Sequence, residues 1–279
     1  QSLPYCKPMN LLRPEMMKFY SAWFCPYAQR AWIVLEHHNI DYELVESLIV
    51  RKDQDGGHNG YDKNSRLLEL NPKGLVPTLE FTPDAMKEMG ADQKEMLKVY
   101  GNVGVLTDSI FCMEFLNSLG EKEKDLITDS TFLTDVQEFN KDICSVFYSV
   151  LMKPTPDEQK KAFDLFCLNV GNFIANVKDE GFYKSAVPTI VDFAVIPWLL
   201  RFSIIEYYRP TFSFEQCLGE DRLGKINAYI ERMKQLPAIQ KTLCKNEEKL
   251  MEVYERYASG KATSQVGKAV RNGLNVHDV

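Results

Sequence analysis

The first part of the chain alternates short apolar runs with amphipathic stretches, a pattern that predicts strands connected by helices. The clearest helix is Pro26–His38, whose apolar residues recur every three or four positions and so share one face. Residues 51–60 are polar and contain three glycines, which predicts a loop. The other predicted elements form a small α/β domain: strands over 16–21, 42–47, 76–81 and 98–103, and helices over 63–70 and 108–118.

The rest of the chain carries helical periodicity only. Apolar side chains recur every three or four residues between 132 and 150, and again between 163 and 177. Pro154 and Pro156 separate these two stripes, because proline interrupts a continuing helix. The same periodicity predicts further helices over 190–205, 221–235 and 238–257.

These patterns predict two domains, an α/β domain over 14–120 and an all-helical domain over 126–258. The charged residues 120–125 are the predicted linker. Residues 82–97 are longer than a usual strand connection, and we expect a surface excursion with a short helix there. Residues 259–279 contain few large apolar side chains and are expected to form a mobile tail.

Composition and charge exclude several classes of protein. The formal net charge is −6, from 33 basic and 39 acidic residues, which argues against a general nucleic-acid binder. No apolar run approaches the ~20 residues that span a bilayer. The seven cysteines are odd in number, widely spaced and without a C-x-x-C pair, so neither a metal site nor a disulfide framework is expected. A reduced, cytoplasmic location is expected, although the first residue, Gln1, leaves a removed targeting peptide open.

Cys25, in Phe24-Cys25-Pro26-Tyr27, is the strongest candidate for chemistry. It stands between the first predicted strand and helix, and Pro26 suits the first helical position. The positive field of a helix N-terminus favours the thiolate, which is the nucleophilic form of cysteine. The alternative is an inert buried thiol, since free cysteine is common in protein cores. Position alone leaves the two interpretations about even.

Two further motifs could bind a ligand. Val76-Pro77 opens a predicted strand and is a candidate cis peptide, which would leave the backbone groups of Val76 available to an extended peptide. The alternative is an ordinary edge-strand proline. Asp108 and Ser109 open a predicted helix, where they could hold an ammonium and a carboxylate, although simple N-capping is favoured for this pair alone.

A fourth motif, Thr189-Ile190-Val191-Asp192, has the spacing of a capping box. We interpret it as a structural element that starts a helix of the second domain. Four histidines, among them His37 and His38 at the end of the first helix, show no metal-ligand spacing.

Together, Cys25, Val76-Pro77 and Asp108-Ser109 resemble the glutathione transferase superfamily over about residues 16–257. The run from Cys25 to Arg30 is similar to the C-P-[FY]-x-x-R motif of the cysteine-type omega class, and residues 71–77 are similar to its N-P-x-G-x-V-P motif. The resemblance implies an N-terminal thioredoxin-like domain followed by an all-helical domain, and a homodimer. Asp108 departs from the glutamate that is commoner in omega enzymes.

The resemblance also implies ligand contacts. Val76 would bind the cysteinyl backbone of glutathione, Asp108 and Ser109 its γ-glutamyl end, and Lys63 its glycyl carboxylate. The same motifs imply glutathione contacts for Tyr27, Leu75 and Pro77. Trp198 lies in a segment similar to the omega-class second-substrate site, and a core aromatic is about as good an account of it.

The function implied is that of a glutathione-dependent thiol transferase or reductase. Cys25 would form a mixed disulfide with glutathione, and a second glutathione would resolve it, because no second cysteine follows at C-x-x-C spacing. Small disulfides, dehydroascorbate and glutathionyl conjugates are the expected substrates, which would suit a role in detoxification. Two alternatives remain open: a transferase that conjugates electrophiles, and a non-catalytic interaction module of the same fold.

Overall fold

Strand β1 (Met17–Ser21) lies inside the sheet of the first part of the structure, and its side chains are almost all buried. It pairs in parallel with β2 (Glu43–Glu46) and antiparallel with β5 (Thr78–Phe81). The computed structural model describes residues 13–52, 54, 58–102 and 104–274. These divide into two compact units: unit 1 comprises residues up to Ile49 with Lys63–Asp125, and unit 2 comprises Val50–Asp62 with the residues from Leu126 onward.

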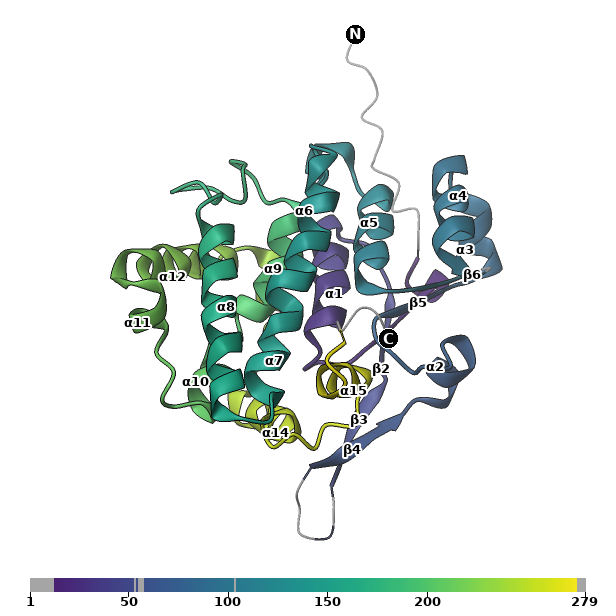
Figure 1. Ribbon diagram of the computed structural model, residues 1–279. Helices are drawn as coiled ribbons and strands as arrows, with labels where there is room; N and C mark the ends of the chain where they lie inside the picture. Colours follow the sequence, from purple (N-terminus) through teal and green to yellow (C-terminus); the bar gives the residue numbers. More distant parts are fainter. Residues whose placement is uncertain (1–12, 53, 55–57, 103, 275–279) are drawn as a thin grey trace. The chain divides into compact units, whose positions relative to one another are not determined.

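Unit 1 is a five-stranded sheet in the order β2-β1-β5-β7-β6, covered by helices. Helix α1 (Pro26–His38) packs beside α5 (Ser109–Leu119), as Figure 1 shows. Ala28 and Ala31 of α1 are small and fully buried. The remaining elements of this part are η1 (Pro14–Met16), α2 (Ser65–Leu70), α3 (Pro83–Glu88), α4 (Ala91–Tyr100), β6 (Gly101–Asn102), β7 (Val105–Thr107) and η2 (Lys122–Lys124).

Apart from a two-stranded sheet described below, unit 2 is helical. Helices α7 and α8 lie side by side (Figure 1), and α6 packs against α9. A π-helical segment, η3 (Asn140–Ser145), joins α6 to α7 in one continuous helical path. The helices are α6 (Thr131–Phe139), α7 (Val146–Met152), α8 (Pro156–Ile174), α9 (Ile190–Leu199), α10 (Phe202–Tyr208), α11 (Phe214–Leu218), α12 (Glu220–Lys234), α13 (Pro237–Thr242), α14 (Glu247–Ala258) and α15 (Gln265–Arg271). A thioredoxin-like sheet-and-helix part followed by a helical part is the fold that the sequence predicted.

The capping box predicted at Thr189 and Asp192 is confirmed. Asp192 is fully buried, and its Oδ2 accepts hydrogen bonds from the Thr189 backbone N–H (2.8 Å) and hydroxyl (2.7 Å). Its Oδ1 accepts from the Tyr183 backbone N–H (2.9 Å) and the Tyr229 hydroxyl (2.8 Å). One carboxylate thus starts α9 and fixes a loop and α12 to it.

The prediction of a loop over 51–60 is wrong. Strands β3 (Leu48–Lys52) and β4 (His58–Lys63) pair with each other in a two-stranded sheet, with residues 53 and 55–57 outside the described part. Ile49 and Val50 give β3 the β-branched side chains that strands favour, and pairing with β3 carries the polar β4 into the same sheet. Lys63 therefore ends a strand, and the short helix after it starts at Ser65.

The strand predicted over 98–103 is also wrong. Residues 98–100 are the last turn of α4, because the helix-forming residues from Ala91 onward continue through Tyr100. The strand is the shorter β6, and β7 was not predicted; Val103 lies outside the described residues. Residues 82–97 hold two helices, α3 and α4, and α4 packs against α5 rather than projecting as a surface excursion.

Residues 259–279 were expected to be a tail, but α15 forms within them. The Ser264 hydroxyl caps this helix by accepting from the Gly267 N–H at 3.1 Å. Ala269 and Val270 are buried, and α15 packs against α7. The two long predicted helices 190–205 and 238–257 are each broken, into α9 and α10 and into α13 and α14. Within the described ranges, no helix is both long and apolar enough to cross a bilayer.

Candidate active site

Cys25 is the N-cap residue of α1, directly before Pro26. Its backbone C=O accepts the Gln29 N–H at 3.0 Å, which closes the first helical turn. Its side chain makes no capping hydrogen bond and is partly exposed. The Sγ atom lies 3.9 Å from the carbonyl oxygen of Val76. The thiol therefore sits at the positive end of α1, within reach of the turn that precedes β5.

The turn over residues 71–77 is fixed by one buried amide. Asn71 Nδ2 donates to the Leu75 carbonyl (3.2 Å) and to Thr78 Oγ1 (3.3 Å), and Thr78 Oγ1 donates to the same carbonyl (2.9 Å). The Val76–Pro77 peptide bond is cis, as predicted from the sequence. These contacts hold Val76 opposite Cys25.

Asp108 caps the N-terminus of α5, which agrees with the N-capping alternative given for the Asp108–Ser109 pair. Its Oδ1 accepts from the backbone N–H groups of Ile110 (2.8 Å) and Phe111 (3.2 Å). Its φ of 74° is a rare value for a residue with a side chain. Such backbone conformations persist where surrounding structure imposes them, and they gather at functional sites. The capping role does not test a ligand role for Asp108, which stays a prediction.

Ser109 connects α5 to α1. Its Oγ accepts a hydrogen bond from Arg30 Nη1 at 3.1 Å, and the Arg30 side chain is fully buried. The guanidinium also lies 5.4 Å from the centre of the Tyr27 ring, in a cation–π contact. The buried Arg30 guanidinium thus contacts both Ser109, at the start of α5, and Tyr27, in the first turn of α1.

Lys63 lies against the turn over residues 71–77. Its Nζ donates to the Lys73 carbonyl at 2.9 Å. Gly74 has a φ of 60°, and a Cβ there would come within 2.6 Å of the Lys63 side chain. Glycine at this position therefore lets the lysine pass over the turn.

For the remaining predicted site residues, Leu75 and Trp198, the informative observation is the exposure of each side chain. Leu75 is exposed beside the buried Val76. Trp198 is on α9 and completely buried in unit 2, which favours its interpretation as a core aromatic over contact with a second substrate. Arg30, Asn71 and Thr78 were not predicted to serve the site. The arginine that ends the C-P-[FY]-x-x-R motif was the available signal for Arg30.

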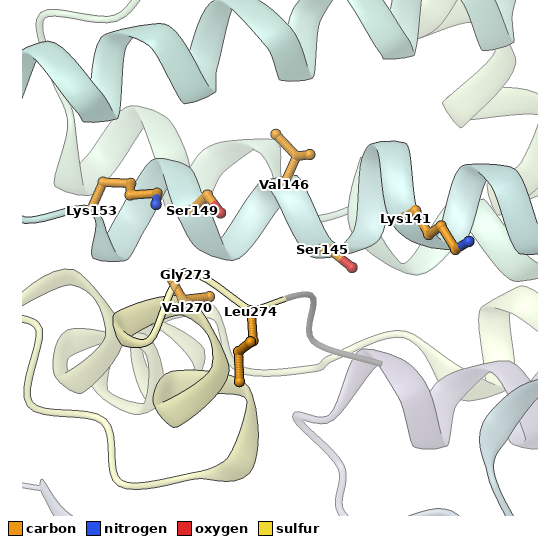
Figure 2. A pocket seen from close by; sticks show the side chains of 8 residues that line it. All are labelled: Lys141, Ser145, Val146, Ser149, Lys153, Val270, Gly273 and Leu274. Atoms are coloured by element: carbon orange, nitrogen blue, oxygen red, sulfur yellow. The ribbon is translucent and has the colours of Figure 1, made fainter. Parts of the chain in front are cut away.

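Unit 2 contains a pocket of about 240 Å³ that the sequence did not predict, because α15 forms one wall of it. Figure 2 shows Lys153 pointing toward Ser149 on one wall, with Val270 and Leu274 on the facing one. Elsewhere in the part of the chain that the structure covers, no three His, Cys, Asp or Glu side chains gather as a metal site would require.

Comparison with known proteins places this geometry in context. Residues 24–119 match the family model described as "Glutathione S-transferase, N-terminal domain". The chain is 26% identical to pyrimidodiazepine synthase from Drosophila melanogaster over 227 residues, covering 80% of this chain and 79% of the relative. It is 23% identical to glutathione S-transferase omega-1 from Rattus norvegicus, with 80% and 79% covered. Among solved structures, glutathione transferase Omega 3C from Trametes versicolor superposes with a TM-score of 0.65 at 22% identity, covering 92% of this chain and 96% of that one.

Proposed function

The chain belongs to the glutathione transferase superfamily and is omega-like, and from that premise we propose that it is a glutathione-dependent thiol transferase with Cys25 as its nucleophile. The observation that carries the proposal is the position of Cys25, whose Sγ lies at the N-terminus of α1 and 3.9 Å from the Val76 carbonyl. A helix N-terminus favours a thiolate, and a thiolate is the reactive species in disulfide exchange.

In the proposed reaction, the Cys25 thiolate attacks the glutathione sulfur of a mixed disulfide. The S–S bond breaks, the second thiol leaves as a thiolate that takes up a proton, and Cys25 is left bonded to glutathione. A second glutathione thiolate then attacks the bound glutathione sulfur, which releases glutathione disulfide and restores the Cys25 thiolate. Glutathione is thus a co-substrate, and it supplies both electrons.

We propose that the turn over residues 71–77 and the start of α5 hold glutathione. Val76 would pair with the cysteinyl backbone, and the Val76 carbonyl beside the Cys25 sulfur supports this placement. Asp108 and Ser109 would hold the γ-glutamyl end. Lys63 would attract the glycyl carboxylate, since its ammonium lies at the same turn. Tyr27, Leu75 and Pro77 flank these groups in the chain and would complete the site.

Two alternative functions make different predictions. A conjugating transferase would stabilise the thiolate of glutathione itself, and it would retain activity without Cys25. An interaction module would bind glutathione without turnover; the capping role of Asp108 and the Arg30–Ser109 hydrogen bond suit it as well as they suit an enzyme. A partly exposed thiol at a helix N-terminus favours the thiol transferase over both.

The test is the intact mass of the protein after brief incubation with glutathione disulfide at neutral pH. The native chain should gain one glutathionyl group, on the peptide that contains Cys25, and reduced glutathione should remove it. Cys25→Ser should gain none, whereas Cys244→Ser, which removes another partly exposed thiol, should behave as the native chain does. An adduct of equal yield in Cys25→Ser would overturn the proposal.

A further inference from the structure

Two thiols meet in unit 2, far along the chain from Cys25. Cys217 is on the short helix α11 and is partly exposed, and Cys167 is on α8 and buried. The Cys217 Sγ lies 3.4 Å from Asp164 Oδ1, and Asp164 is one helical turn before Cys167 on α8. Each thiol also acts on the pKa of the other, which places the two side chains within interaction range. The two sulfurs are therefore neighbours across the α8–α11 contact.

An aromatic cluster holds these helices in place. Phe214, three residues before Cys217, lies 5.0 Å from the Phe163 ring and stacks on Phe202 with ring centres 4.2 Å apart. The Phe166 ring, adjacent to Cys167 in the chain, is 6.3 Å from Phe214. Packed aromatic pairs of this kind fix the register of α11 against α8, so the proximity of the sulfurs follows from the core and does not depend on a mobile loop.

The two cysteines differ in their exposure to solvent. Cys217 is the one that solvent can reach, and Lys160 lies beside it through its ion pair with Asp164, at 2.5 Å. Burial is the largest cause that raises the pKa of both thiols, and the Asp164 carboxylate raises them further. Both thiols therefore rest in the protonated form, and an oxidant would meet Cys217 first.

We propose that Cys217 and Cys167 form a second redox site, a dithiol that reacts with glutathione disulfide and closes into a disulfide between α11 and α8. Cys217 loses its proton to solvent and attacks one sulfur of glutathione disulfide, which releases one glutathione thiolate. The Cys167 thiol then loses its proton and its sulfur attacks Cys217, which releases the second glutathione. Two thiols are oxidised, and one glutathione disulfide is reduced to two glutathione molecules. The site needs nothing from Cys25.

The experiment uses a chain in which Cys6, Cys25 and Cys244 are changed to Ser, so that among the residues the structure describes only Cys112, Cys144, Cys167 and Cys217 keep their thiols. It is incubated with glutathione disulfide at mildly alkaline pH, where the thiolate fraction is larger. The expected result is a loss of the mass of two hydrogen atoms, with no retained glutathionyl group. Proteolysis without reductant should release one linked pair of peptides containing Cys167 and Cys217.

Two matched variants in the same background test the order of attack. With Cys167→Ser, a glutathionyl adduct on Cys217 should persist, because nothing resolves it. With Cys217→Ser, the mass should stay unchanged, because Cys167 is buried. A persistent adduct on Cys217 while Cys167 is present would overturn the proposal, as would an unchanged mass in the parent chain. These results do not bear on the proposal for Cys25, because Cys25 is replaced by Ser in every chain of this experiment.

Discussion

Arg30 and Ser109 join the two helices of unit 1 through a buried hydrogen bond of 3.1 Å between Nη1 and Oγ. A fully buried guanidinium is costly to desolvate, and the Ser109 hydroxyl and the face of the Tyr27 ring contact this one. Arg30 thus sets the position of the start of α5 relative to α1, which carries Cys25 at its N-terminus. The contact couples the two parts of the proposed glutathione site.

Replacing Arg30 tests this coupling. We expect Arg30→Ala to lower the free energy of unfolding by roughly 2–5 kcal/mol, because it leaves a cavity at a fully buried position and the Ser109 hydroxyl without its donor. Arg30→Lys should not restore it, since an ammonium cannot reproduce the planar set of donors. Urea unfolding measures both variants. Ser109→Ala should cost about 1 kcal/mol, and an equal cost for both positions would contradict the role given to Arg30.

Cys25→Ser separates chemistry from stability. Its side chain caps no backbone group and is partly exposed, so we expect a change in unfolding free energy within about 0.5 kcal/mol. Thiol transferase turnover should fall by at least about a hundredfold, because a hydroxyl is not ionised at neutral pH and cannot exchange disulfides. Steady-state kinetics with a glutathionylated peptide measures this. Conjugation of an aryl halide should not fall in parallel.

Asn71 tests whether the turn presents Val76 to a ligand. Asn71→Asp replaces an amide donor by an acceptor, so the contacts to the Leu75 carbonyl and Thr78 Oγ1 are lost. We expect roughly 1–3 kcal/mol of destabilisation and a higher KM for glutathione with the adduct at Cys25 still forming at high concentration. Thr78→Val is the matched comparison, since it removes the Thr78 hydroxyl from both of its hydrogen bonds but leaves the Asn71 donor on the Leu75 carbonyl in place. An unchanged KM in Asn71→Asp would remove the turn from the glutathione site.

Much of the fold was predictable from residues that act on their immediate neighbours in the chain. Pro26 after Cys25 and the Thr189–Asp192 spacing each fix a helix start within a few residues, and both were placed correctly from the sequence. The failures arose where pairing or packing outweighs local pattern. Strand β4 is polar and becomes a strand only because β3 lies beside it, and α15 is stable only because Ala269 and Val270 pack on α7. The buried link from Arg30 to Ser109 joins residues 79 positions apart, and no spacing rule encodes it.

Asp192 should be the most sensitive polar residue of unit 2. Its two oxygens accept four hydrogen bonds, from Thr189, Tyr183 and Tyr229. We expect Asp192→Ala to cost roughly 3–5 kcal/mol, because it leaves buried donors without acceptors. Tyr229→Phe removes one donor and should cost about 1–2 kcal/mol. Chemical unfolding of unit 2, followed by helical circular dichroism, distinguishes the two. A smaller loss for Asp192→Ala than for Tyr229→Phe would contradict the network.

His38 is expected to make unit 1 sensitive to acid. Asn117 donates through Nδ2 to Asp125 (2.8 Å), so its Oδ1 accepts from His38 Nε2 (3.0 Å), and the ring is the neutral tautomer with its proton on Nε2. Its Nδ1 faces Gly120 and has no hydrogen-bond partner among the described residues. A second proton would therefore be buried without an acceptor. Burial, with His37 adding repulsion, lowers the pKa of His38 from 6.5 to about 4.

The direction of the pH dependence of stability follows from the pKa of His38 in the unfolded chain and in the folded chain. Between pH 6.5 and about 4 the unfolded chain binds a proton at His38 that the folded chain does not, so stability falls as the pH falls through this window. The slope from this one residue approaches about 1.4 kcal/mol per pH unit. His38→Gln can still donate to Asn117 but cannot be protonated, so its unfolding free energy should fall less steeply over the same window. Urea midpoints at several pH values measure both chains; parallel slopes would show that His38 is not the group being titrated.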